Sequence, residues 1–228
     1  MARLARVVLP GLPHHVTQRG NGRQRTFFND DDYALYRALL REHCARASVA
    51  VWSWVLMPNH AHLVLVPSDA DGLRRALAPL HRAYAGYAHE RMRRTGHFWQ
   101  GRFGCVAMDE AHAQAAIVYG LMNPVRAGLA RRALDWRWSS VHALTGGRDD
   151  AITDVAAVRE RLPDLEARLA AGEEHEASER LRRAESVGRP LGDAAFLAAV
   201  EELTGRRLSP ARRGRKAKAK EQISALSP

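Results

Sequence analysis

The stretch Met57-Pro-Asn-His-Ala-His-Leu-Val-Leu65 decides more of the fold than any other nine residues of the chain. It has the pattern of a β-strand that begins just after a turn. Side chains two apart on a strand point to the same face, so His60 and His62 project together. Two imidazoles on one rigid face make half of a divalent-metal site. The plain alternative is a pair of histidines on a half-exposed sheet face.

The flanking segments supply this strand with partners. Residues 49–56, VAVWSWVL, are rich in β-branched and aromatic side chains and predict a strand that forms a hairpin with it. Further strands are predicted over residues 14–19 and 102–108. Helices are predicted over residues 71–94 and from Asp30-Asp-Asp, which offers helix caps, to about residue 46.

A helix is also expected from Asp109 to about Met122, where Asn123-Pro124 should end it. The order is then β-α-β-β-α-β with an extra helix. It predicts an α+β, ferredoxin-like fold, in which a four-stranded antiparallel sheet carries helices on one face. Residues 136–145 are expected to pack back onto this core.

The charge divides the chain into three parts, for which we predict separate roles. Residues 1–148 carry a net charge of +10, residues 149–204 one of −7 and residues 205–228 one of +7. We therefore predict a main domain (1–148), an acidic helical extension (149–208) and a basic flexible tail (209–228). Two basic regions favour a polyanionic partner, most simply nucleic acid. No run of 18 apolar residues is present, so we expect no membrane span and a cytoplasmic location.

Tyr119 and Asn123 are four residues apart on the predicted helix and so share one of its faces. Beside the histidine strand, they would present a phenol and an amide to the two imidazoles. Such a set suits phosphodiester transesterification, in which a tyrosine oxygen attacks phosphorus and a metal ion acts as Lewis acid. The free phenol has a pKa of about 10 and needs activation, but the sequence names no base.

Several motifs together resemble those of single-tyrosine transposases of the IS200-like (HUH, Y1) superfamily, and more narrowly those of REP-associated tyrosine transposases. The resemblance covers roughly residues 1–145. It is carried by HHVTQRGN, FFNDDDY, MPNHAHLVL, FWQGRF, Trp138-Ser-Ser140 and Tyr119-Gly-Leu-Met-Asn-Pro-Val-Arg-Ala-Gly-Leu129.

The resemblance implies a ferredoxin-like fold, a Mg²⁺ or Mn²⁺ ion held by His60 and His62, and Tyr119 as the nucleophile of a 5′-phosphotyrosine intermediate. A third ligand follows the tyrosine by four residues in related enzymes and is often Gln. Asn123 stands at that place here; it is shorter and precedes a proline. The implied substrate is hairpin-containing DNA that is cut as a single strand.

Other side chains are candidates for DNA contacts because they flank the expected site or lie in the basic tail. They are Arg19, Arg23, Arg25, Trp99, Arg102, Arg126, Arg212, Arg213, Arg215, Lys216, Lys218 and Lys220. Six other histidines are expected to be surface or structural residues: His14, His15, His81, His89, His97 and His112. Tyr84 and Tyr87 rival Tyr119 as nucleophile.

Two functions remain open, an enzyme that cuts and rejoins DNA and a domesticated protein that only binds DNA hairpins. A histidine-triad nucleotide hydrolase is excluded, because it would need a histidine where Val64 stands. The sequence does not decide between a monomer and a homodimer.

Overall fold

The computed structural model describes residues 6–146, 148–172 and 175–208. The basic tail that begins at residue 209 lies outside the described residues. Its DNA contacts therefore stay predictions: Arg212, Arg213, Arg215, Lys216, Lys218 and Lys220.

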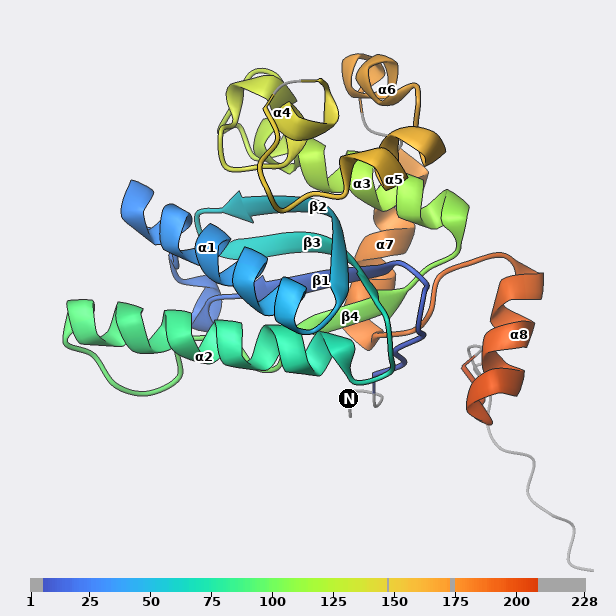
Figure 1. The fold of residues 1–228 in the computed structure, drawn as a ribbon, viewed down its shortest axis with the longest axis horizontal. Helices are drawn as coiled ribbons and strands as arrows, with labels where there is room; N and C mark the ends of the chain where they lie inside the picture. The colour runs from blue at the N-terminus through green and yellow to red at the C-terminus, as the bar shows by residue number, and fades with distance from the viewer. Residues whose placement is uncertain (1–5, 147, 173–174, 209–228) are drawn as a thin grey trace, which may run out of the picture.

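Four strands form one antiparallel sheet in the order β2-β3-β1-β4 (Figure 1). The strands are β1 (His14–Arg19), β2 (Val49–Met57), β3 (His60–Pro67) and β4 (Gly104–Ala107). This order, with one helix between β1 and β2 and another between β3 and β4, is the ferredoxin-like arrangement. The predicted fold class is confirmed, and β4 is shorter than the predicted strand over 102–108.

The predicted hairpin joins β2 to β3 through the two-residue turn Pro58-Asn59, which places Met57 opposite His60. The turn is itself tied to the loop after β1. Gly20 N–H donates to the Asn59 carbonyl at 3.0 Å, and Thr26 N–H donates to the Pro58 carbonyl at 2.8 Å. These bonds fix the point at which β3 begins, and therefore the position of His60.

A β-bulge interrupts β2 between Val51 and Ser53. Val51 and Trp54 pack on one face of the sheet, whereas Trp52 and Val55 pack on the other. A strict period of two would have put Val51 and Val55 on the same face. The bulge therefore reverses the facing of the second half of the strand.

Helices α1 (Asp30–Arg46) and α2 (Gly72–Met92) cover one face of the sheet (Figure 1). The side chain of Asn29, rather than one of the three aspartates, caps α1 by accepting from Asp32 N–H at 3.0 Å. Asp32 is buried and instead accepts from Arg91 of α2 at 2.8 Å. This ion pair ties the two helices together.

Helix α3 (Glu110–Arg126) covers the opposite face, and Asp109 caps it as predicted. The prediction that Asn123-Pro124 ends this helix was wrong, because the helix runs through Pro124 to Arg126. Proline removes one N–H donor. That loss falls in the last turn, where the Asn123 carbonyl still accepts from Ala127 N–H at 2.9 Å. Asn123 therefore stays helical, one turn beyond Tyr119.

Residues 136–145 pack back onto the sheet, as expected, along the outer edge of β2. Leu56 N–H donates to the Trp138 carbonyl and Ser140 N–H to the Trp54 carbonyl, both at 2.9 Å. Short helices surround this segment and follow it along the chain. They are η2 (Ala133–Asp135), α4 (Val141–Leu144), α5 (Val155–Arg161), α6 (Leu165–Ala171), α7 (His175–Val187) and α8 (Ala194–Thr204); one further short helix, η1 (Asn21–Arg23), follows β1.

The C-terminal helices lie on the α3 side of the sheet and along its β4 edge (Figure 1). Leu181 and Ala184 of α7 are buried in the same cluster as the apolar side of α3. Leu191 then lies beside β4, and its N–H donates to the Ala107 carbonyl at 2.8 Å. Among the described residues, no helix is long and apolar enough to cross a lipid bilayer.

Two buried histidines make the free energy of unfolding depend on pH. Burial lowers the pKa of His14 to about 4 and that of His81 to about 3. His14 Nε2 also accepts from Leu9 N–H at 3.0 Å, and its Nδ1 lies 2.8 Å from the Leu12 carbonyl, so both nitrogens are satisfied only in the neutral ring. Both folded pKa values lie below the unfolded value of 6.5.

Below pH 6.5 the unfolded chain therefore binds more protons than the folded one, and stability falls as the pH falls. Each such histidine should cost about 1.4 kcal/mol between pH 7.5 and 5.5. We predict that His81→Gln makes this fall about 1.4 kcal/mol shallower, whereas the exposed His97→Gln leaves it unchanged. Urea unfolding at both pH values measures the difference. An equal fall in the free energy of unfolding for His81→Gln and wild type would contradict the prediction.

Candidate active site

His60 and His62 lie on the face of the sheet that α3 covers. They alternate with Ala61, which points into the core on the other side. The centroids of the two imidazoles are 4.7 Å apart, with the rings nearly perpendicular. The shared face predicted from the His-x-His spacing is therefore present in the fold.

Both imidazoles are held neutral. Burial, followed by the charges of Arg19 and Arg126, lowers the pKa of His60 to about 3. Burial, followed by the neighbouring His60 and His15, lowers the pKa of His62 well below its usual value. A neutral imidazole has a free lone pair, which is the form that binds a metal ion.

The ring of His60 is oriented by the residue that precedes it. His60 Nδ1 lies 2.5 Å from Asn59 Oδ1. An amide oxygen only accepts, so Nδ1 carries the proton and Nε2 keeps its lone pair. This donor set, a neutral nitrogen on each of two adjacent rings, fits a divalent ion such as Mg²⁺ or Mn²⁺.

Tyr119 projects from α3 toward the two strands that carry histidines. Its ring centroid is 5.7 Å from that of His62 and 6.1 Å from that of His15, in both cases edge-on. The guanidinium carbon of Arg126 lies 4.3 Å from the centroid of the Tyr119 ring. The helix thus brings the phenol to the histidines, as the spacing predicted.

Asn123 is buried one turn further along α3. Its Oδ1 accepts a hydrogen bond from Arg126 Nη2, whereas its buried Nδ2 has no hydrogen-bond partner among the described residues. Oxygen is the atom through which an amide ligates a metal ion. As placed, that oxygen is already engaged by Arg126, so the ligand role of Asn123 stays a prediction.

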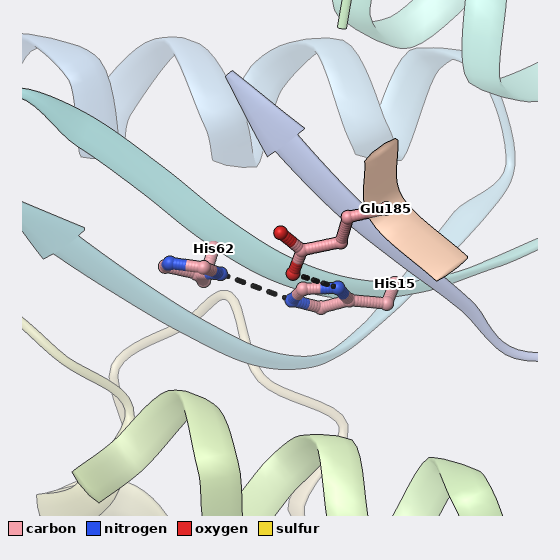
Figure 2. A group of neighbouring side chains, drawn as sticks. All are labelled: His15, His62 and Glu185. Carbon is pink, nitrogen blue, oxygen red and sulfur yellow. Dashed lines mark hydrogen bonds and ion pairs between the residues drawn. The ribbon is translucent and has the colours of Figure 1, made fainter. Parts of the chain in front are cut away.

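His15 is part of this cluster, although we expected only a surface or structural role for it. It lies on β1 and is buried, and its ring stacks on that of His62 with centroids 5.2 Å apart. His15 Nε2 lies 3.0 Å from His62 Nδ1. The opposite nitrogen of His15, Nδ1, lies 3.0 Å from Oε1 of Glu185 on α7. Figure 2 shows that His15 contacts both of the other side chains: one dashed line joins it to His62 and another to the carboxylate of Glu185.

Arginines predicted to contact DNA line a pocket of about 280 Å³ beside this cluster. Arg19, Arg23 and Arg102 are joined there by Arg182 of α7, which the sequence did not single out. One wall is Gly104, where a Cβ would lie 2.6 Å from Thr17 Oγ1, so a side chain at this position would force Thr17 to move. The pocket is therefore basic, and it adjoins the histidine cluster through Glu185, which also lines it.

Other predicted site residues lie elsewhere. The Nε1 of Trp99 donates to the His81 carbonyl at 2.9 Å, and its ring packs against Phe98 with centroids 4.7 Å apart. Arg25 Nε donates to the Phe27 carbonyl at 2.6 Å, away from the basic pocket. The rival Tyr84 is fully buried on the α1/α2 face, where its hydroxyl donates to the Thr26 carbonyl.

Residues 11–119 match the family model described as "Transposase IS200 like". No curated protein matches the chain. Among solved structures, a REP-associated tyrosine transposase bound to a REP hairpin is similar with a TM-score of 0.53 and 21% identity, over 68% of this chain and 93% of that chain. A Deinococcus radiodurans protein assigned as a transposase gives a TM-score of 0.37 and 15% identity, over 56% and 92%.

The structural likeness to the REP-associated enzyme shows a common fold. The family model adds sequence: its match runs from the residues before β1, through both histidines of β3, to Tyr119 of α3. The resemblance described from the motifs is thereby confirmed: residues 11–119 match the IS200-like transposase family, and the fold is that of a REP-associated tyrosine transposase.

Proposed function

We propose that this protein is a transposase that cuts and rejoins single-stranded DNA, with Tyr119 as its nucleophile. The observation that carries the proposal is the edge-on approach of the Tyr119 ring to His62, at 5.7 Å between centroids. It brings a nucleophile beside a pair of neutral, metal-competent imidazoles, which is the combination that phosphodiester transesterification needs.

In the proposed reaction, the Tyr119 oxygen attacks a backbone phosphorus, and the bond from phosphorus to the 3′ oxygen breaks. The 3′ oxygen leaves with the bonding electrons and takes up a proton, while the phenolic proton is lost to solvent. The product is a 5′-phosphotyrosine and a free 3′ hydroxyl. Because the covalent link conserves the energy of the broken bond, rejoining needs no ATP.

His60 and His62 would hold a divalent ion through the nitrogen that each leaves free. When bound, a Mg²⁺ or Mn²⁺ ion supplies a Lewis acid for the phosphate under attack. Asn123 would complete the ligand set through its amide oxygen. Arg126 lies over the Tyr119 ring and contacts Asn123, so it is placed to hold both side chains.

We infer that the DNA strand runs through the basic pocket lined by Arg19, Arg23, Arg102 and Arg182. Arginine is well suited to phosphate because its planar fork can donate two parallel hydrogen bonds. A hairpin-forming strand is our proposed substrate, since the similar REP-associated structure is bound to a REP hairpin.

We predict that Tyr119→Phe lowers formation of the covalent protein–DNA adduct at least about 1000-fold while hairpin binding persists, because only the nucleophilic oxygen is removed. Tyr87→Phe, on the far face of the sheet, is the matched control and should react normally. Denaturing gels of a labelled hairpin oligonucleotide measure both. Hairpin binding by the wild type without any adduct would favour a protein that only binds DNA.

We predict that His60→Ala and His62→Ala each lower metal-dependent cleavage by about 100-fold or more, since a Lewis acid is worth several kcal/mol. The exposed His97→Ala serves as control. Asn123→Ala tests the third ligand and should have an equally large effect only if its oxygen turns to the metal. Wild-type cleavage that persists in excess chelator would refute a metal mechanism.

For the DNA path, we predict that the double variant Arg23→Ala/Arg102→Ala lowers the salt slope of hairpin binding by about 1.4, at about 0.7 for each single-strand contact. Arg46→Ala removes an exposed arginine at the end of α1 and should leave the slope unchanged. The measurement is affinity across a salt series. An unchanged slope in the double variant would place the strand outside this pocket.

A further inference from the structure

We propose that Glu185 and His15 are positioning residues that fix the proton of His62, so that α7 of the C-terminal extension helps to set up the metal site. This inference rests on the proposed function, in which His60 and His62 hold the ion. It is carried by two separations of 3.0 Å, from Glu185 Oε1 to His15 Nδ1 and from His15 Nε2 to His62 Nδ1.

The order of these contacts decides where each proton lies. An ionised carboxylate only accepts, so the nitrogen of His15 that faces Glu185 carries a proton. In the tautomer of His15 with its proton on Nδ1, the Nε2 has a lone pair and accepts from His62 Nδ1. His62 Nδ1 therefore carries the proton of that ring, and its Nε2 is left with a lone pair for a metal ion. Ligand histidines are commonly fixed in this way by the hydrogen bond of the opposite nitrogen.

The two ligand histidines reach the same state by different routes. His60 takes its orientation from Asn59, the preceding residue in the chain. His62 depends on a strand partner and on Glu185, which lies more than 120 residues further along the chain. Both routes end with a proton on Nδ1 and a free Nε2.

The position of Glu185 follows from how α7 packs. Leu181 and Ala184 are buried against the cluster that includes α3, which fixes the rotation of the helix. Glu185 is 19% exposed, at the edge of the basic pocket, and points to His15 (Figure 2). Its Oε1 and His15 Nδ1 are buried and, within the described part of the chain, have no aligned hydrogen-bond partner, so the 3.0 Å contact between them is oblique.

Direct ligation by Glu185 is the competing role, because ligand-type atoms of His15, His62 and Glu185 lie within 4.8 Å of one another. A metal ion held by Glu185 and His15 Nδ1 would displace the proton from that nitrogen, which lies 3.0 Å from Glu185 Oε1. In the positioning role the proton stays on His15 Nδ1, facing the carboxylate. The two roles differ in the metal-free protein, where only positioning affects the proton of His62.

The test is therefore made first without metal. Two-bond ¹H–¹⁵N correlation spectra distinguish the two neutral tautomers of each histidine, and the His62 signals are assigned with His62→Gln. We expect the Nδ1–H form of His62 in the wild type and a mixture of both forms in Glu185→Gln, whose amide can donate as well as accept. Glu185→Asp should restore the wild-type form in part. Glu179→Gln, on the same helix but exposed, should change nothing.

Metal affinity is measured next, by titrating Mn²⁺ and following the free ion by electron paramagnetic resonance. We expect Glu185→Gln to raise the Kd about tenfold, Glu185→Asp by less, and Glu179→Gln not at all. Thermal melts show that each variant is folded.

Three other results would decide between the positioning role, direct ligation and the proposed metal site. An Nε2–H form of His62 in the wild type, or a tautomer unaffected by Glu185→Gln, overturns the positioning role, and lost affinity with an unaffected tautomer identifies Glu185 as a ligand instead. A tautomer change in a protein that binds no Mn²⁺ supports the positioning role and contradicts the proposed metal function.

Discussion

The antiparallel pairing of β1 with β3 is the constraint on which the site depends. In this register His62 lies opposite Thr17 and His15 opposite Val64. Side chains opposite each other share a face, so one register brings His15, His60 and His62 together. A shift by one residue would turn His60 and His62 into the α1/α2 core and leave Ala61 under Tyr119. The turn at Pro58-Asn59, bound to the loop after β1, stabilises the correct register.

Burial then determines the chemistry of this face. Imidazoles packed this closely beneath α3 and beside arginines would repel one another if they were charged, and burial penalises the charged form further. The lowered pKa values of His60 and His62 follow from these two effects. The site is therefore ready for a cation without first losing protons. The arginines lie at its rim, where they can attract phosphate.

Much of the fold was predictable because it depends on local pattern. The period-two strands, the Pro58-Asn59 turn and the cap at Asp109 are each signalled within a few residues. The bulge in β2 was not predictable. VAVWSWVL carries apolar side chains on both faces of the strand, so its pattern does not show where the side chains change face. The predicted end of α3 was wrong. The residue before a proline disfavours helical backbone angles, but the hydrogen bonds that Ala127 and Leu129 donate to the carbonyls of Asn123 and Pro124 hold the last turn helical.

The positions of the site residues were likewise predictable only where they depend on local sequence pattern. His60, His62 and Tyr119 carry short-range signals, namely a two-residue spacing and a helix face. His15 lies on a predicted strand, but nothing in the sequence says which strand it will lie beside, and no pattern links it to Glu185. The family match ends at Tyr119, whereas Asn123, Arg126, Arg182 and Glu185 all follow it. The side chains proposed for the chemistry, apart from Asn123, thus lie in the matched segment together with Asn59 and His15, whereas Arg126, Arg182 and Glu185 come from the part of the chain that the family model does not cover.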